Sequence, residues 1–405
     1  MPVWDDVVGQ ERVVAELAAA AADADAQVTA ESSGGTWEGG AASRMTHAWL
    51  FTGPPGSGRS TAARAFAAAL QCTSPDRALG GAPGCGFCDG CHTTLVGTHA
   101  DVEFVRSDLL SIGVKETREL VRRAALSPAG RRWQVIVMED ADRLTEGAGN
   151  VLLKAVEEPA PRTVWLLCAP SVEDALPTIR SRCRLLSLRT PSPEAVADVL
   201  MRRDGIEPEL AARVARATQG HIGRARRLAT DETARARRAA VLRVPLRVAD
   251  IGGCLRAAQE LVDSAAEDAK AVAEEVDGKE TEEMRAALGA AAGAGSRMPR
   301  GTAGVMKELA DRQKRRSTRT QRDTLDLALT DLAAFYRDVL ALQLRAPGGI
   351  ANTEIRDGIE QIASSSRPEQ SLRRIEAVLA CRDALDRNVA PLLAVEAMTL
   401  ALRAG

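Results

Sequence analysis

The stretch AWLFTGPPGSGRST, Ala48 to Thr61, decides how the amino-terminal part of this chain folds. AWLFT is a short apolar run of the kind that forms a buried strand, and GPPGSGRS follows it with the glycine spacing of a phosphate-binding loop. Glycines let backbone N–H groups turn toward phosphate oxygens, and the start of the next helix adds partial positive charge. The stretch therefore predicts a strand, a phosphate-binding loop and a helix in direct succession.

One position of this loop departs from the pattern, because Arg59 stands where such a loop has lysine. A lysine ammonium reaches the β- and γ-phosphates as a compact charge, whereas a guanidinium is planar, forked and bulkier. We therefore expect ATP hydrolysis to be lost, while binding of ATP or ADP without turnover stays open. The candidate nucleotide-binding residues of the loop, with Ser60 as a candidate Mg²⁺ ligand, are Gly53, Gly56, Gly58, Arg59, Ser60 and Thr61.

The second motif, which we call the acidic motif, is VIVMEDADRL at Val135 to Leu144, an apolar run that ends in carboxylates. In phosphate-loop proteins the end of such a strand holds Mg²⁺ and the attacking water, in the usual order Asp then Glu. Here Glu139 precedes Asp140, so the candidate base is one methylene short, and a displacement of about 1 Å can cost about 100-fold in rate. The alternative is that both carboxylates only cap and solvate the end of the strand.

Four cysteines at metal-ligand spacing, Cys72, Cys85, Cys88 and Cys91, lie in CTSPDRALGGAPGCGFCDGC. Two adjoining C-x-x-C steps and one more distant thiolate allow a closed tetrahedral site, for which Zn²⁺ is the expected ion. His92 is an alternative ligand, but four thiolates already fill the coordination shell. With no position left for water, we predict a structural zinc that folds this four-cysteine module, residues 72–91.

Five β-type runs alternate with helical patterns over the first 190 residues or so, which predicts an α/β domain with a parallel sheet covered by helices on both faces. Ala22 to Arg44 is rich in Ser, Gly and Ala without periodicity, so we expect a mobile loop there. The five runs are AWLFT, DVEFV (Asp101 to Val105), WQVIVM (Trp133 to Met138), VWLLC (Val164 to Cys168) and CRLLSL (Cys183 to Leu188).

After the break TPSP at Thr190 to Pro193, every pattern is helical. We predict three domains: residues 1–192 with the sheet, a small helical domain over 193–236, and an all-α domain over 237–405. Ala287 to Gly304 is too rich in glycine for a stable helix and is expected to form a flexible break. The basic stretch RQKRRSTRTQR is expected to be a solvated charged face, with contact to nucleic-acid phosphates as the alternative.

Composition excludes some classes of function. The net charge of −2 over 405 residues argues against a strongly basic, whole-surface binder of nucleic acid. No apolar run approaches the roughly 20 residues that span a bilayer, and the start MPVWDDVVGQ is acidic, so we expect a cytoplasmic protein without membrane contact.

Arg180 and Arg182 in IRSRC are either surface arginines or arginines that act on a phosphate in trans.

In order and spacing, these motifs resemble the clamp-loader branch of the AAA+ ATPases over roughly the first 230 residues. The resemblance includes the phosphate loop and the four cysteines already described. It also includes VVGQERV near the start, NVLLKAVEEP at Asn150 to Pro159, and LPTIRSRC at Leu176 to Cys183. In GHIGRAR, Gly223 stands where the motor subunits have a sensor arginine, and Arg224 is one residue away. Lys154, Glu157 and Glu158 are expected to be helix-surface residues without chemistry.

The resemblance implies an AAA+ module, a helical lid and a carboxy-terminal collar through which five subunits form an open ring. The implied partners are the gamma/tau and delta subunits of bacterial DNA polymerase III, and through them the sliding clamp and primed DNA. For a stator subunit the resemblance implies that Arg182 is an arginine finger acting on a neighbour's ATP. The alternatives are a self-sufficient ATPase motor of gamma/tau type and a zinc-dependent nucleic-acid-binding module.

Overall fold

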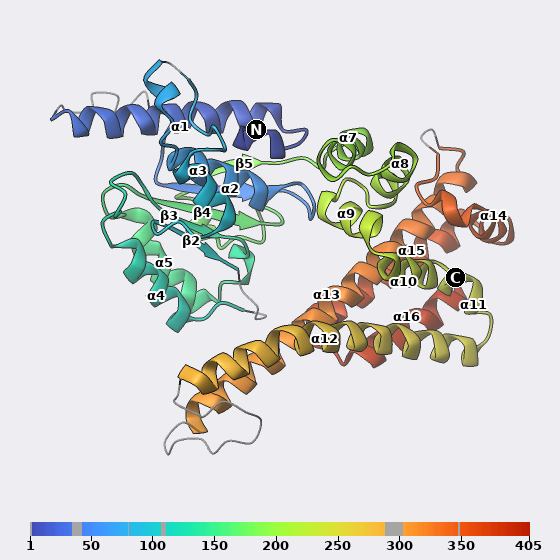
Figure 1. Ribbon diagram of the computed structural model, residues 1–405. Coiled ribbons are helices and arrows are strands. Elements are labelled where there is room, and N and C mark those ends of the chain that lie inside the picture. The colour runs from blue at the N-terminus through green and yellow to red at the C-terminus, as the bar shows by residue number, and fades with distance from the viewer. Residues whose placement is uncertain (1, 35–42, 80, 107–110, 288–302, 347–348) are drawn as a thin grey trace. The chain divides into compact units, whose positions relative to one another are not determined.

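The structure is a computed structural model that describes residues 2–34, 43–79, 81–106, 111–287, 303–346 and 349–405. It divides into two compact units, Met1–Ala229 and Thr230–Gly405, which we describe separately (Figure 1). The first unit contains a sheet and the second is helical. In the described part of the chain, no helix is long and apolar enough to cross a membrane.

The described residues of the first unit form a five-stranded parallel sheet in the order β2-β3-β4-β1-β5. This confirms the predicted α/β fold, and each predicted strand agrees with the observed one to within one residue at either end. β1 and β3 both run toward the edge of the sheet where the phosphate loop and the acidic motif begin. The strands are β1 (Ala48–Thr52), β2 (Val102–Val105), β3 (Gln134–Met138), β4 (Thr163–Ala169) and β5 (Arg184–Ser187).

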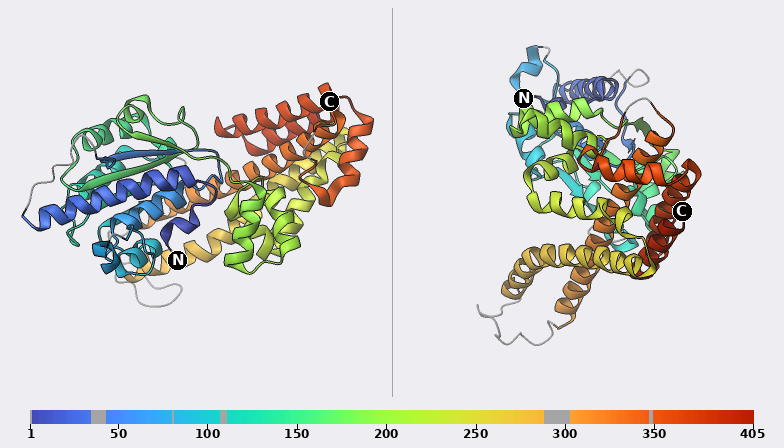
Figure 2. Two further views of the ribbon diagram at one scale, coloured as in Figure 1. Left: turned by 90° about the horizontal axis from the view of Figure 1, so that it is seen from above. Right: turned by 90° about the vertical axis from the view of Figure 1, so that its right-hand side faces the viewer.

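Helices cover both faces of the sheet (Figure 2). Because side chains alternate along a strand, Trp49 and Phe51 of β1 join the core under α1 and α2, where Trp49 meets Phe66 edge to face at 5.2 Å. Leu50 points the other way, into the core under α4 and α5. These helices and their neighbours are α1 (Glu11–Ser32), α2 (Arg59–Leu70), α3 (Asp89–Val96), α4 (Val114–Ala124), α5 (Glu146–Glu157) and α6 (Pro177–Arg180). Short 3-10 turns are η1 (Val3–Asp6), η2 (Pro75–Leu79) and η3 (Ala141–Arg143).

The prediction of a mobile loop from Ala22 to Arg44 is wrong for the first half of that segment. α1 continues to Ser32, because Ala24 and Val28 extend the apolar stripe of the helix and are buried against the core. Alanine-rich segments favour the helix where such burial supports them. Residues 35–42 of the predicted loop lie outside the described residues.

Three short helices complete the first unit: α7 (Pro193–Asp204), α8 (Pro208–Ala217) and α9 (Ile222–Thr230). Ser192 caps α7 by accepting a hydrogen bond from the Ala195 amide at 3.2 Å. Gly205, with φ of 64°, then ends the helix in the left-handed conformation that favours glycine.

The second unit is a helical bundle whose core includes Phe335, Tyr336 and Leu332. Its long helices α12 and α13 pack against each other, and Arg316 of α13 makes ion pairs with Asp277 and Glu280 of α12. Of the predicted break from Ala287 to Gly304, residues 288–302 lie outside the described residues, while Ala287 ends α12 and Ala303 and Gly304 begin α13. The helices are α10 (Glu232–Leu242), α11 (Val244–Arg247), α12 (Ile251–Ala287), α13 (Ala303–Gln343), α14 (Arg356–Ser365), α15 (Pro368–Asp386) and α16 (Pro391–Ala404), with the 3-10 turn η4 (Thr353–Ile355).

Candidate functional site

The predicted phosphate-binding loop lies between β1 and α2, so the strand, loop and helix follow one another as the sequence predicts. Gly58 is the N-cap of α2 with φ of 89°, and Gly56 has φ of 87°. Gly56 is required for a second reason, since a Cβ there would lie 2.7 Å from Cα and Cβ of His221. Two glycines of the loop thus adopt the left-handed conformation, and a residue that precedes α9 packs directly against the loop.

The guanidinium of Arg59 turns back onto its own loop, where Nη1 donates a hydrogen bond to the Gly53 carbonyl. Burial lowers the pKa of Arg59, and the nearby Asp140 and Asp142 oppose that shift. Burial also raises the pKa of Asp142, a carboxyl group that we had not singled out from the sequence. Arg59 therefore lies among the acidic motif's side chains with a backbone carbonyl as its acceptor.

Both predicted carboxylates of the acidic motif have an arginine of the same chain beside them. Glu139 Oε1 is 3.4 Å from Nη2 of Arg64 on α2, and that guanidinium also stacks over the ring of Phe104 at 4.2 Å. Asp140 Oδ1 is 3.7 Å from Nε of Arg143 in the following turn. The strand end that would hold Mg²⁺ is thus partly neutralised by internal cations.

Two residues that sequence reasoning missed join this region together. His221 lies in GHIGRAR, and burial lowers the pKa of its imidazole, with Arg224 and Arg59 adding to the effect. Gln10 lies in VVGQERV and is almost fully buried; its Nε2 donates to the Ser57 carbonyl at 3.3 Å and its Oε1 accepts from the Arg189 amide at 3.2 Å. Gln10 thereby connects the amino-terminal motif, the phosphate loop and the segment after β5.

Arg182 follows α6 and is exposed. Its Nε makes an ion pair with Glu157, the last residue of α5, while Nη1 donates to the Thr178 carbonyl at 2.9 Å and to Ser181 Oγ at 3.0 Å. Within the described part of the chain, no hydrogen bond or ion pair joins Arg182 to the phosphate loop. Glu157, expected to be a plain surface residue, is the carboxylate partner of this arginine.

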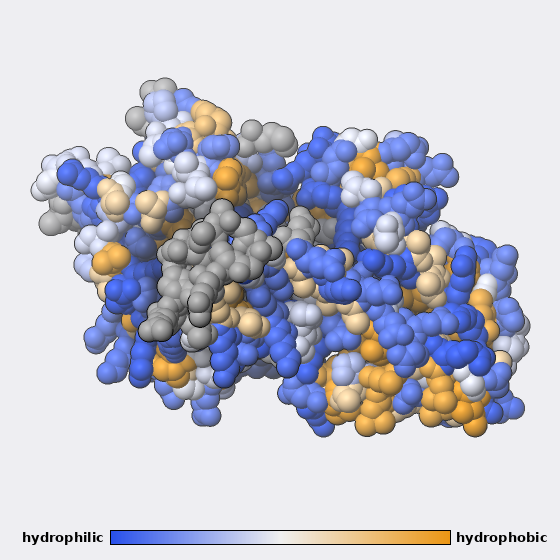
Figure 3. Space-filling model, turned by 60° about the horizontal axis from the view of Figure 1, so that its bottom comes forward, coloured by the Kyte–Doolittle hydropathy of each residue, from blue (hydrophilic) through white to orange (hydrophobic). Residues whose placement is uncertain are grey.

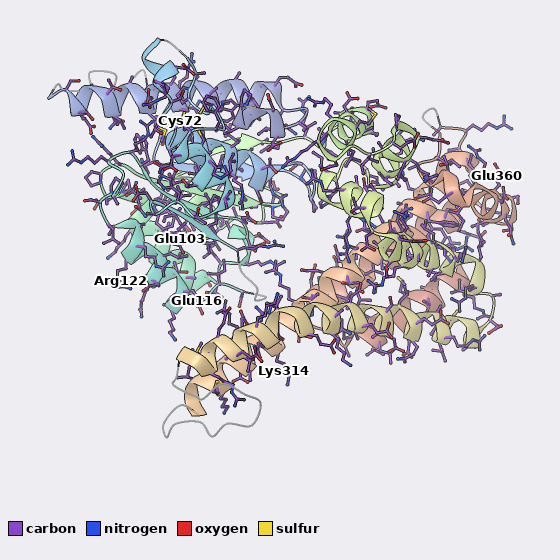
Figure 4. All side chains as sticks on the ribbon, viewed as in Figure 1. Cys72, Glu103, Glu116, Arg122, Lys314 and Glu360 are labelled. Atoms are coloured by element: carbon purple, nitrogen blue, oxygen red, sulfur yellow. The ribbon has the colours of Figure 1, made fainter. Side chains whose placement is uncertain are left out.

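The four predicted metal ligands come together in space, with their Sγ atoms all within 4.8 Å of one another. Figure 4 labels Cys72, the first cysteine of this group. Cys72 Sγ lies 3.8 Å from Cys85 Sγ and 3.9 Å from Cys88 Sγ, and Cys85 Sγ lies 4.0 Å from Cys91 Sγ. A tetrahedron with Zn–S bonds of about 2.3 Å has edges of about 3.8 Å. The group therefore fits a four-thiolate metal ion, and His92 is not a member of it.

Hydrogen bonds lower the pKa of Cys72 and Cys88, whereas burial raises the pKa of Cys85. The Thr73 amide donates to Cys88 Sγ at 3.3 Å, and the Cys88 amide donates to Cys85 Sγ at 3.3 Å. A hydrogen bond from the Cys91 thiol lowers the pKa of Cys72 and raises the pKa of Cys91 itself. Cys72 and Cys91 are buried in the core under α1 and α2, so the module is anchored to the sheet domain from both ends.

The sheet order, the phosphate loop after β1, the acidic motif after β3 and the helices that follow define an α/β module of AAA+ type. Residues 38–192 match the family model described as DNA polymerase III, delta subunit. This part of the chain is similar to DNA polymerase III subunits of the delta' and gamma/tau kinds.

Two curated relatives and one solved structure illustrate the similarity. The chain is 33% identical over 198 residues to DNA polymerase III subunit gamma/tau of Mycobacterium bovis, covering 49% of this chain and 30% of that protein. It is 32% identical over 175 residues to DNA polymerase III subunit delta' of Bacillus subtilis, covering 43% and 51% respectively. It thus spans about half of their length or less. A DNA polymerase III gamma subunit-related protein of Thermotoga maritima superimposes with a TM-score of 0.40 at 14% identity, covering 88% of this chain and 93% of that one.

Proposed function

We propose that this chain is a clamp-loader subunit of delta' type within the DNA polymerase III holoenzyme. It is a largely non-hydrolysing stator that assembles with gamma/tau and delta subunits into a hetero-pentamer and helps to load the sliding clamp on primed DNA. The observation that carries this proposal is that side chains of the chain itself contact the residues that would bind a nucleotide.

Three contacts make up that observation. Arg59 donates to the Gly53 carbonyl, where a lysine would reach for phosphates, and His221 packs against Gly56 on the other side of the loop. Glu139, on the side that would hold Mg²⁺, lies beside Arg64. These contacts support a retained framework whose turnover is lost.

The proposal gives the chain its part in ATP chemistry through Arg182, as an arginine finger in trans. A guanidinium supplied by a neighbouring subunit has only to be exposed and within reach of the phosphates, and such arginines are worth about 10³- to 10⁵-fold in kcat. Arg182 is exposed, and it lies on the short segment between α6 and β5, which is held on the sheet domain.

We assign the AAA+ domain to residues 1–192, the lid to 193–236 and the collar to 237–405. An apolar groove on the helical unit supports assembly through this collar. The groove lies between α15 and α16 and has a volume of about 260 Å³, and Leu393 at its edge is 62% exposed. Apolar side chains also gather on the face of this unit shown in Figure 3. Exposed apolar patches of this kind mark protein interfaces. The lining residues are Ala377, Ala380, Cys381, Ala384, Val389, Leu393, Ala394, Ala397, Met398 and Ala401.

For the four-cysteine module we propose a structural Zn²⁺ held by Cys72, Cys85, Cys88 and Cys91. All four positions of a tetrahedral ion would be filled by thiolates, so no water could be activated there. The ion would fix the loop between α2 and α3 and take no part in hydrolysis.

A motor of gamma/tau type is the second candidate. The observation that favours it is the 33% identity to a gamma/tau relative, which equals the identity to delta' relatives within a few per cent. The two candidates differ in one property, because a motor turns over ATP at its own loop and a stator does not.

The proposal is tested in a complex reconstituted with gamma/tau and delta subunits. Arg182→Ala is expected to leave assembly intact and to lower the DNA-stimulated ATPase activity. Arg118→Ala on α4, another exposed arginine, is the matched control and is expected to change neither property. An ATPase rate that is the same for Arg182→Ala and for the unaltered complex would contradict the trans-acting role.

A further inference from the structure

We infer that Glu157 is a positioning residue that orients Arg182 toward the nucleotide of the neighbouring subunit. The inference rests on the proposed function and concerns how the arginine is held before it meets a phosphate. The ion pair between Arg182 Nε and the Glu157 carboxylate carries it.

The contacts around Arg182 fix its guanidinium and leave one nitrogen for a ligand. Nε is engaged by Glu157, and Nη1 is engaged by the Thr178 carbonyl and Ser181 Oγ. In the described part of the chain, Nη2 makes no hydrogen bond. Because the guanidinium is planar, holding two of its nitrogens fixes the direction in which the third donates. An arginine held in this way loses less rotamer freedom when it binds a phosphate.

The ion pair is poorly suited to stabilising the fold. Its side chains are 39% and 41% exposed, and exposed pairs contribute little to stability. Glu157 is also the last residue of α5, where the helix dipole disfavours a negative charge. A carboxylate at an unfavourable position, paired with an arginine of proposed function, is better explained by orientation of that arginine.

The two helices that carry the pair pack closely against each other. Gly149 of α5 lets α6 approach closely, since a Cβ at Gly149 would lie 2.1 Å from Cδ1 of Leu176. Ile179, the residue of α6 that faces the core, is 2% exposed. Glu157 at one end of α5 and Arg182 after α6 are therefore carried by two helices in direct contact.

The test uses the reconstituted complex with Glu157→Gln, and with Glu158→Gln as the matched control, since Glu158 is the exposed neighbour on the same helix end. Glu157→Gln is expected to lower kcat for DNA-stimulated ATP hydrolysis at the neighbouring site by about 10- to 100-fold, because a displacement of about 1 Å can cost about 100-fold. The KM for ATP and assembly are expected to stay unchanged. Glu158→Gln is expected to behave as the unaltered complex.

The double variant separates positioning from any other role of Glu157. If Glu157 acts through Arg182, then Glu157→Gln in an Arg182→Ala background has no further effect on kcat. An additional, multiplicative loss would overturn the inference, and so would a normal kcat for Glu157→Gln in a complex that Arg182→Ala impairs. A normal kcat for Arg182→Ala alone would instead overturn the proposed function, and the positioning role with it.

Discussion

Removal of one thiolate from the four-cysteine module is a sharp test of the proposed zinc site. Cys88 is the best position, because it is only half-buried and serine keeps its size. The amides of Thr73 and Cys91, which donate to Cys88 Sγ at 3.3 and 3.4 Å, can still donate to a serine oxygen. The substitution therefore removes a metal ligand with little change in packing.

The size of the effect follows from the loop that the metal closes. Cys72 and Cys91 enclose a segment of about 20 residues, and a cross-link over such a loop is worth about 3 kcal/mol in chain entropy. For a unit of this size, each kcal/mol shifts the Tm by about 2 to 4 °C. Loss of the metal is thus expected to lower the Tm by about 6 to 12 °C. The sheet should stay folded, because most of its two cores lies outside the module.

The assay combines elemental analysis with thermal unfolding in the presence and absence of a chelator. The unaltered chain is expected to hold about one zinc ion and to lose stability on chelation. Cys88→Ser is expected to start at the lower Tm and to be insensitive to the chelator. Cys254→Ala, a buried cysteine of the helical unit, is the control and should keep its zinc. A metal-free chain whose Tm the chelator does not change would refute the reasoning.

Three further outcomes are expected. The pKa of His221 is lowered by burial, so below about pH 6.5 the unfolded chain binds a proton that the folded chain does not. The free energy of unfolding therefore decreases as the pH falls through the folded pKa. His221→Gln should make the free energy of unfolding in urea less dependent on pH between about pH 7 and 5. An unchanged pH dependence would contradict this. Arg238→Met should lower the free energy of unfolding by about 1 to 3 kcal/mol, because it removes a buried guanidinium that contacts Asp331, Glu354 and Asn352; an unchanged free energy of unfolding would speak against it. Leu393→Asp, in the α15–α16 groove, should abolish co-elution with gamma/tau while leaving the helical content of the chain unchanged, and normal co-elution would exclude the groove as an interface.

The sequence predicted the sheet well because its strands are short apolar runs separated by helical patterns. AWLFT and the residues after it are typical of a buried strand that is followed by a phosphate loop. The four cysteines were equally informative, since their spacing restricts them to one site. α1 was underestimated because the burial of Ala24 and Val28 depends on the core against which they pack, and local composition does not report that core.

The contacts on which the proposed function rests were harder to predict, because they join residues far apart in the chain. His221 and Gly56 are separated by more than 160 positions, and nothing in GHIGRAR indicates that its histidine packs on a glycine of the phosphate loop. Glu157 shows the same difficulty, since a glutamate at the end of a helix is ordinary until its arginine partner is known. Residue types and spacing thus identified the motifs, whereas the side-chain contacts of each motif became visible only in the tertiary structure.

ATP binding and turnover by the isolated chain test the central claim most directly. Equilibrium binding of MgATP and steady-state hydrolysis would be measured on the purified protein, with Arg59→Lys as a comparison that restores the usual loop residue. The account predicts no turnover by either protein, since Glu139 stays beside Arg64 and the order of the two carboxylates is unchanged. Hydrolysis by the unaltered chain that is lost on changing Ser60 or Asp140 would contradict the account and identify a motor.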